Sequence, residues 1–212
     1  MSPERISVII QQKIEAYDPS GNLDHTARLI LALMSLRHSR TKLHVERVAL
    51  MAEEVASDMG KDARQAFFSG LLHDIGKLVL PYHLFADQSI TDDEFSEITS
   101  HAAAGHKVLE PFHLYTALVA GIHHRAQDRG YGLTLTDFPE DMPLSQVKKV
   151  LNIAVIVGVC DFIDAWQNRG DTLRDGRKKT DLDLRSLLLE KYPDDSQVVD
   201  LALVAADKVR TI

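Results

Sequence analysis

Histidine and aspartate side chains that could bind metal ions recur along this sequence. The chain has ten histidines, and five separate segments with helical patterning each present an imidazole or a carboxylate. Seven residues make up the candidate ligand set: His44, His73, Asp74, His101, His123, His124 and Asp161. Imidazole and carboxylate groups without thiolates suit manganese, iron, cobalt, nickel or zinc, rather than a structural zinc site built from cysteines.

The pairing of these residues predicts a centre with two divalent metal ions. Adjacent ligands at a helix end, such as His73 and Asp74, can point toward two neighbouring ions, and the Asp74 carboxylate can bridge them. Two neighbouring ions hold the attacking and leaving oxygens of an in-line phosphoryl displacement. We therefore expect hydrolysis of a small phosphorylated or nucleotide substrate by attack of a metal-bound hydroxide.

The expected burial and helical position of each acid and histidine indicate whether it binds a metal. Asp161 lies in an apolar run (residues 157–163), and a buried carboxylate is costly unless it is paired or metal-bound. Asp164, one turn later, is expected either to support a ligand or to lie on the helix surface. His106 is five positions from His101 and off that residue's helical face, so we expect no ligand there. The other four histidines are expected at the surface or in satisfied core positions: His25, His38, His83 and His113.

The elements that must position these residues are predicted to be helices throughout. Apolar residues recur at spacings of three and four, and no alternating strand pattern is present. The first helix is expected to begin at Ser2 as its N-cap. Another is expected to open at the capping box Thr91 to Glu94. Apart from the helix that opens at this capping box, the expected helical ranges are about 2–17, 23–36, 43–59, 62–72, 111–124, 143–168, 182–191 and 196–209. These patterns predict an all-α fold of about eight to ten helices in one compact unit, with residues 1–40 as accessory helices and 41–212 as the main domain.

The bulk composition narrows the class of protein. The formal net charge is −7, which disfavours general binding of nucleic acid because an acidic surface repels a phosphate backbone. The N-terminal residues lack the pattern of a signal peptide, and the most apolar stretch, Val150 to Cys160, is shorter than a membrane-spanning helix. The single cysteine, Cys160, excludes a disulfide within the chain. We expect a cytoplasmic protein without a membrane segment, and its oligomeric state stays open.

Several motifs carry a resemblance to a known family. Leu71 to Lys77, which contains His73 and Asp74, resembles the signature of the HD superfamily of metal-dependent phosphohydrolases. The wider pattern, over about Leu43 to Trp166, resembles the HD-GYP subgroup, which hydrolyses cyclic di-GMP in bacteria. The other segments that match are His44 to Ala49, Leu80 with Pro81, Thr91 to Glu94, His101 to Gly105, His123 with His124, and Asp161 to Ala165. The resemblance implies an HD-domain helical bundle, the seven ligands above, and Asp74 and Lys77 as catalytic residues, with Lys77 facing a substrate phosphate.

Four positions depart from the subgroup. Its Gly-Tyr-Pro is Gly130 to Gly132 here, and glycine in place of proline frees the backbone φ, so we expect a less preorganised loop. Arg125 replaces the acid that follows the double histidine. Arg40 stands where three-metal members carry an extra acidic ligand, which favours two metals. Arg169 is an approximate counterpart, displaced by one position, of an arginine that follows the last motif, and Arg125 and Arg169 are candidate substrate contacts.

Three functions are compatible with the sequence. The first is a phosphodiesterase that acts on a cyclic dinucleotide such as cyclic di-GMP or on a related nucleotide. The second is a phosphomonoesterase or nucleotidase, since both occur in the wider superfamily. The third is a catalytically silent module that binds a nucleotide or a protein. Retention of all seven ligands favours the two enzymes.

Overall fold

The computed structural model describes residues 3–18, 21–85, 90–127, 130–168, 170–171 and 177–211. These residues form α-helices, with short 3₁₀ turns between some of them and no β-strand, so the all-α prediction is confirmed. The α-helices are α1 (Pro3–Tyr17), α2 (Asn22–Arg37), α3 (Ser39–Asp58), α4 (Ala63–Leu72), α5 (Asp92–Thr99), α6 (His101–Leu109), α7 (Leu114–Ile122), α8 (Leu144–Asn168), α9 (Leu184–Lys191) and α10 (Ser196–Thr211). The 3₁₀ helices are η1 (Ile75–Val79), η2 (Tyr82–Phe85), η3 (Leu135–Asp137) and η4 (Lys179–Asp181).

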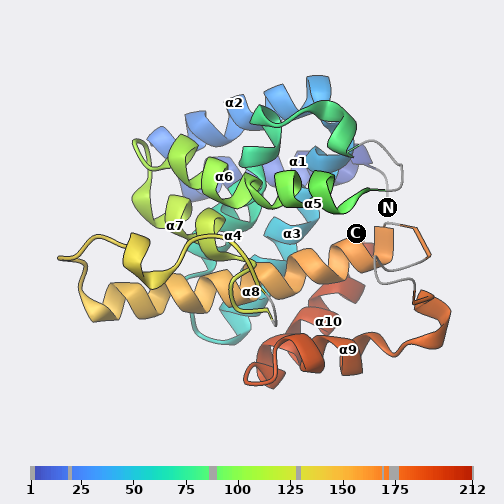
Figure 1. Cartoon of the computed structure of the whole chain (residues 1–212). Helices are drawn as coiled ribbons and strands as arrows, with labels where there is room; N and C mark the ends of the chain where they lie inside the picture. Colours follow the sequence, from blue (N-terminus) through green and yellow to red (C-terminus); the bar gives the residue numbers. More distant parts are fainter. Residues whose placement is uncertain are drawn as a thin grey trace.

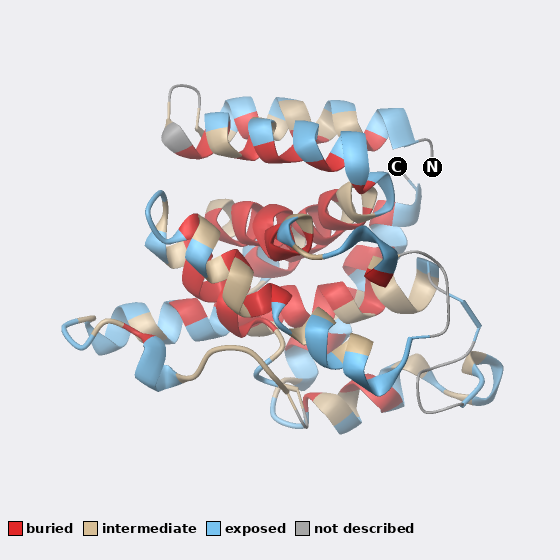
Figure 2. Ribbon diagram, turned by 45° about the horizontal axis from the view of Figure 1, so that its top comes forward, coloured by how far each residue is buried: buried red, intermediate tan, exposed pale blue. Residues whose placement is uncertain are grey.

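Helix α3 is the centre of the arrangement. It packs against α1, α2, α4, α8 and α10, and its inward residues belong to a continuous apolar core. Figure 1 shows α8 running across α3 and α4, with α9 and α10 beyond it. Figure 2 shows that the buried residues are concentrated in helices that lie between the layer of α1 and α2 and the remaining helices. The side chains that could bind metal therefore lie on helices that pack against neighbouring helices on several sides.

Most helix boundaries agree with the sequence prediction. The capping box at α5 is present, with reciprocal hydrogen bonds between Thr91 and Glu94. Pro143 directly precedes α8, as predicted. Helix α3 begins at Ser39, four residues earlier than expected, because only His38, with non-helical φ and ψ, separates it from α2. The Ser2 N-cap lies outside the described residues.

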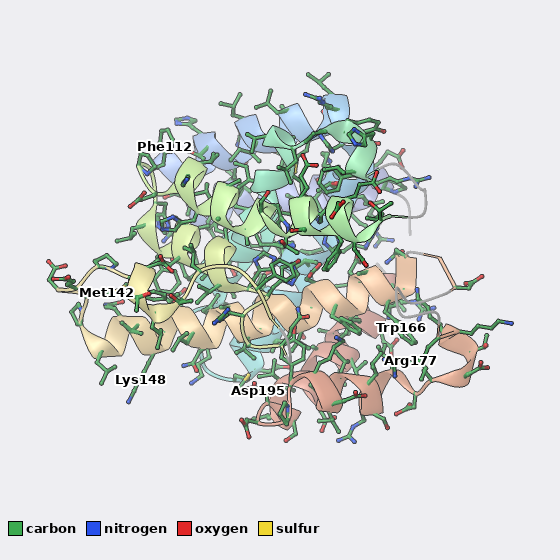
Figure 3. The ribbon with its side chains drawn as sticks, in the orientation of Figure 1. Phe112, Met142, Lys148, Trp166, Arg177 and Asp195 are labelled. Carbon is green, nitrogen blue, oxygen red and sulfur yellow. The ribbon has the colours of Figure 1, made fainter. Side chains whose placement is uncertain are left out.

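One predicted helix is shorter than expected. The sequence pattern suggested helix from residue 111 to residue 124, but α7 begins only at Leu114. Pro111 cannot donate a backbone hydrogen bond, and the chain turns between α6 and α7. His113 then caps α7, because its Nδ1 accepts a hydrogen bond of 3.2 Å from the Thr116 backbone N–H. Phe112 lies on the outside of this turn (Figure 3).

Buried polar contacts attach α1 to α3. The Glu46 carboxylate is fully buried and accepts hydrogen bonds from the Ser7 hydroxyl at 3.0 Å and the Lys42 ammonium at 2.6 Å. Glu53, two turns later, accepts a hydrogen bond of 2.7 Å from Lys13. A buried carboxylate without such partners would be strongly destabilising. The N-terminal layer therefore satisfies charges on the helix that also carries His44, and the division at residue 40 stays a prediction.

Helix α8 is the longest helix of the described chain. By length and composition alone it is long and apolar enough to cross a membrane, and no other helix of the described residues is. The most apolar 18-residue window of α8 is 61% buried inside the structure. Core helices of soluble proteins share this property, since a helix that is apolar on most sides is covered by its neighbours.

Candidate metal centre

The seven predicted ligands lie together at the middle of the helical core. His44 comes from α3, His73 and Asp74 follow α4, His101 begins α6, His123 and His124 follow α7, and Asp161 lies on α8. Three groups place one ligand atom of each member within 4.8 Å of the others. These groups are His44, His73 and Asp161; His73, Asp74 and His123; and His101, His123 and His124.

Five of the candidate ligand atoms are buried without hydrogen-bond partners. This holds for the Nε2 atoms of His44, His73, His101 and His123 and for Oδ1 of Asp74. Buried polar atoms in folded proteins almost always have a partner. Several unpartnered imidazole nitrogens that face the same carboxylates therefore fit a divalent metal site, since a metal ion would satisfy them together.

Asp74 lies between the groups. Its Oδ2 is 3.5 Å from Nε2 of His44 and 3.6 Å from Nε2 of His73, and its Oδ1 is 3.3 Å from Nε2 of His101. Asp161 faces the first group, with Oδ1 at 3.0 Å from Nε2 of His44. The two oxygens of Asp74 thus point toward different sets of imidazoles, which is the geometry that a bridging carboxylate needs.

Local backbone contacts orient three of the imidazoles. Nδ1 of His73, His101 and His123 lies 2.8, 2.7 and 2.8 Å from the carbonyl oxygen of the residue three positions earlier. A carbonyl can only accept, so each Nδ1–H donates and each Nε2 keeps its lone pair for a metal. His73 and His123 are the C-cap residues of α4 and α7, where the last turn of the helix offers such carbonyls.

Two glycines allow the ligand segments to approach one another. A Cβ added at Gly76 would lie 1.9 Å from the carbonyl oxygen of His101, and one added at Gly158 would lie 2.3 Å from that of His123. Gly76 lets η1 pack on α6, and Gly158 lets α8 pack on the end of α7. Without these contacts Asp74 and Asp161 could not come as close to the histidines.

The electrostatics around Asp74, His101 and His124 favour the protonation states that bind metal. Burial raises the pKa of Asp74, but Lys77 and the neighbouring histidines outweigh it and hold that pKa well below the usual value. Burial lowers the pKa of His101 to about 4 and of His124 to about 3. Burial lowers the pKa of His44, but the carboxylates of Asp161 and Asp164 beside the ring outweigh it, so that pKa is raised. At neutral pH the carboxylates are ionised, and His101 and His124 are neutral.

The predicted substrate contacts lie in different places. Lys77 is buried, and its ammonium contacts Asp74 and lies 5.8 Å from the centroid of the Phe85 ring. Arg125 is exposed and lines a mostly apolar pocket of about 500 Å³ between residues 133–138 and α8. Arg169 lies outside the described residues. Lys77 is thus the predicted substrate contact that the structure brings to the ligands.

The loop that contains Gly130, Tyr131 and Gly132 packs on His124. The Tyr131 ring lies 4.4 Å from the His124 ring and 6.0 Å from the His101 ring, centroid to centroid. Gly132 has a φ of +103°, which proline cannot adopt because its ring fixes φ near −65°. The next residue, Leu133, donates a backbone hydrogen bond of 2.8 Å to the Gly121 carbonyl. The positive φ that glycine allows at position 132 thus lets the loop turn and form a hydrogen bond with α7.

Comparison with known proteins shows the family to which this chain belongs. The sequence model of the HD domain family matches residues 42–166, more than half of the chain. The chain belongs to the HD domain family. The family match includes all seven candidate ligands and Lys77, while α1, α2, the first residues of α3 and the segments after α8 lie outside it.

Relatives of this HD domain include phosphodiesterases. It is 30% identical over 146 residues, 65% of this chain, to a cyclic di-GMP phosphodiesterase of Thermotoga maritima. It is 28% identical over 144 residues, 64% of the chain, to a cyclic di-GMP phosphodiesterase of Pseudomonas aeruginosa. It is 29% identical over 162 residues, 74% of the chain, to ribonuclease Y of Mesoplasma florum. The matches cover only 37%, 33% and 26% of the length of these three relatives.

A solved structure has the same fold. The crystal structure of the HD domain of the L. monocytogenes phosphodiesterase PgpH superposes with a TM-score of 0.52 at 18% identity. The superposition covers 86% of this chain and 97% of that chain. A second structure of the PgpH domain, in complex with cyclic-di-AMP, gives the same TM-score. The prediction of an HD-type helical bundle is confirmed.

Proposed function

We propose that this HD domain is a metal-dependent phosphodiesterase that hydrolyses a cyclic dinucleotide, with cyclic di-GMP as the first candidate. The observation that carries the proposal is the set of buried, unpartnered ligand atoms that meet around Asp74. Two relatives named as cyclic di-GMP phosphodiesterases support the substrate class. We place the chain near the HD-GYP subgroup on the motifs that it shares with that subgroup.

We infer that the centre binds two divalent ions. His44, His73 and Asp161 would hold one, and His101, His123 and His124 the other, with Asp74 shared between them. Ions bound there would polarise phosphoryl oxygens and lower the pKa of water. Iron, manganese, nickel, cobalt and zinc all suit this combination of ligands.

The protein's own groups would bind and orient the substrate. The Lys77 ammonium would hold a phosphoryl oxygen beside the shared carboxylate, since it reaches Asp74 from η1. Tyr131 packs on the rings of His101 and His124, so substrate would approach over the edge formed by His124, Asp161 and Lys77, beside Tyr131. Arg125 and Arg169 stay proposals as contacts to the more distant parts of a substrate.

A substrate panel tests this proposal. Protein purified without oxygen and loaded with Mn²⁺ or Fe²⁺ should hydrolyse cyclic di-GMP or cyclic di-AMP faster than p-nitrophenyl phosphate, and Asp74→Ala should abolish the activity. Hydrolysis of the monoester alone would favour the phosphomonoesterase, and hydrolysis of a short RNA alone would favour the reaction that ribonuclease Y is named for. Equal inactivity of wild type and Asp74→Ala on every substrate would establish the silent module.

A further inference from the structure

His44 differs from the other buried candidate imidazoles in what orients it. His73, His101 and His123 donate from Nδ1 to a carbonyl of their own backbone. Nδ1 of His44 instead lies 2.7 Å from Oδ2 of Asp164, which is 120 positions away in the chain and lies on α8. The orientation of this one ligand therefore depends on a side chain that a substitution can remove.

Asp164 is itself held in a fixed position. Arg47, one turn after His44 on α3, contacts both carboxylate oxygens, with Nη2 at 2.8 Å from Oδ2 and Nε on Oδ1. Asn168, one turn after Asp164 on α8, donates to Oδ1 at 3.1 Å. Asp164 is 2% exposed. A two-pronged arginine contact fixes the plane of a carboxylate as well as its position.

The chemistry of this contact sets the state of the His44 ring. An ionised carboxylate can only accept, so the His44 Nδ1–H donates to Asp164. In a neutral ring with its proton on Nδ1, Nε2 is the nitrogen whose lone pair is left for a metal. That nitrogen faces Asp161 and Asp74, at 3.0 and 3.5 Å. An outer carboxylate that fixes the tautomer and the ring orientation of a histidine strengthens its bond to a metal.

We infer that Asp164, held by Arg47, is a positioning residue for metal binding through His44. It does not touch the metal position; it acts by fixing which nitrogen of His44 is free and where that nitrogen points. The inference rests on the proposed metal-dependent function. It also explains why a buried carboxylate and a half-buried arginine lie paired beside the centre without belonging to the ligand set.

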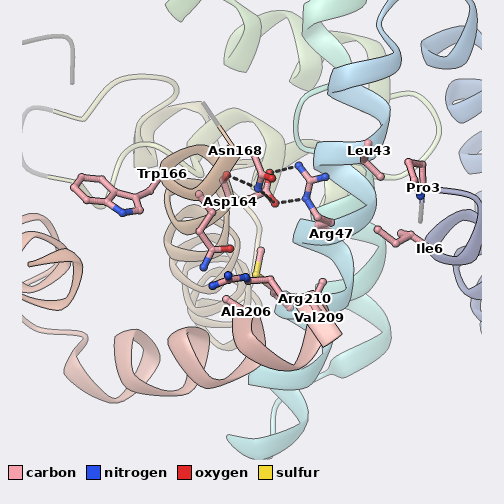
Figure 4. A pocket seen from close by; sticks show the side chains of 12 residues that line it. Pro3, Ile6, Leu43, Arg47, Asp164, Trp166, Asn168, Ala206, Val209 and Arg210 are labelled. Atoms are coloured by element: carbon pink, nitrogen blue, oxygen red, sulfur yellow. Dashed lines mark hydrogen bonds and ion pairs between the residues drawn. The ribbon is translucent and has the colours of Figure 1, made fainter. Parts of the chain in front are cut away.

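The surroundings of the Arg47–Asp164 pair make a direct test available. Arg47, Asp164 and Asn168 line a pocket of about 740 Å³ that also contacts Trp166 and Arg210 (Figure 4). Removal of the Asp164 carboxylate would therefore leave a gap that a small anion can reach from the pocket, with Arg47 still present to bind it. Formate has the charge and shape of the missing group.

The experiment measures metal affinity and the His44 tautomer, not activity. In Asp164→Ala the affinity for Mn²⁺, measured by calorimetry, should fall by 10- to 100-fold, the effect typical of losing such a carboxylate, and added formate should restore most of it. In Asp164→Asn, which keeps the shape, the affinity should also fall, but formate should have no effect because the gap is filled. Asp200→Ala, which removes the carboxylate of the exposed Arg185–Asp200 pair, should leave affinity unchanged.

Nitrogen NMR of the metal-free protein at alkaline pH provides a second readout. Wild type should show His44 with its proton on Nδ1, Asp164→Ala should show a mixture of tautomers, and formate should restore the Nδ1–H form. The inference would be overturned if both Asp164 variants kept the metal affinity and the His44 tautomer of the wild type. It would also be overturned if Asp164→Ala lost affinity and formate did not restore it. A wild-type protein that binds no metal would instead overturn the proposed function.

Discussion

The ring of Tyr131 packs against the ring of His124, with 4.4 Å between the centroids and 36° between the planes. This contact closes one side of the centre. The side chains of His124, Asp161 and Lys77 are 10–12% exposed, whereas those of His73 and His101 are 0–1% exposed. The accessible edge of the centre therefore includes His124, Asp161 and Lys77, and Tyr131 borders it at His124.

Gly132→Pro should displace this loop. Proline cannot adopt the positive φ of Gly132, and an added Cβ would lie 2.3 Å from the Gly121 carbonyl oxygen. We expect a loss of about 1–3 kcal/mol in the free energy of unfolding and a lower kcat/KM, with metal content unchanged because no ligand belongs to the loop. Urea unfolding, kinetics and elemental analysis test this. Gly170→Ala, with nothing within 4 Å of the added Cβ, is the control; equal kinetics in both variants would contradict a role for the loop.

Gly158→Ala should move α8 away from α7. The new methyl group would lie 2.3 Å from the His123 carbonyl oxygen and 3.0 Å from the Tyr192 hydroxyl. Overpacking of this kind costs about 1–3 kcal/mol, and it should also reduce metal content because Asp161 lies less than one turn away. Gly105→Ala is a matched control within a buried helix, since its nearest neighbour would be at 3.4 Å. Full metal content in Gly158→Ala would show that the close approach does not position Asp161.

Asp74→Ala and Lys77→Met should have different effects. Asp74 faces both groups of imidazoles, so its removal should reduce metal content sharply and abolish turnover. Lys77 contacts Asp74 but offers no ligand, so Lys77→Met should keep the metal. We expect kcat/KM to fall on the order of 100-fold in Lys77→Met, as when one donor to a developing charge is lost. If metal content were unchanged in Asp74→Ala, its bridging role would be wrong.

The metal-free protein should lose stability as the pH falls below 6.5. Burial lowers the pKa of His101 to about 4 and of His124 to about 3, so the folded protein keeps these rings neutral while the unfolded chain binds protons near pH 6.5. Each such histidine should reduce the free energy of unfolding by roughly 1.4 kcal/mol per pH unit until its folded pKa is reached. His44, whose pKa is raised, acts in the opposite direction.

Urea unfolding of the metal-free protein between pH 7 and pH 4 measures this dependence. His124→Asn should flatten the curve, because one of the protons that the unfolded chain takes up is removed. His25→Asn, a change at an exposed position, should leave the slope as it is. A stability that stays constant from pH 7 to pH 4 would contradict the neutral state of the buried imidazoles.

Much of the centre could be predicted because the types of its residues indicate its chemistry. Seven imidazoles and carboxylates on helical segments indicated a metal site, and Asp161 in an apolar run was recognisable from the cost of burying a carboxylate. The role of Asp164 could not be decided, since its partner His44 is 120 positions away and only the packing of α3 on α8 joins them. Asp164 lies one helical turn after Asp161, and this spacing was the one signal in the sequence that could have favoured a role for Asp164 in supporting a metal ligand.

The fold was predictable to the level of its helices, and the exceptions have local causes. The turn between α6 and α7 follows from Pro111 and from the His113 cap, whose imidazole is an unusual acceptor for a helix N-terminus. The close approaches at Gly76 and Gly158 could not be inferred, because glycine within a helical pattern gives no information about which backbone lies opposite. The conformation of Gly132 was left open by the sequence for the same reason.

The location of bound metal tests the central claim most directly. Crystals grown with Mn²⁺ and measured at a wavelength where manganese scatters anomalously should show two peaks. One should lie among His44, His73 and Asp161, and the other among His101, His123 and His124, with Asp74 in contact with both. Anomalous density at other positions, or none at these two sites in crystals saturated with Mn²⁺, would contradict the account.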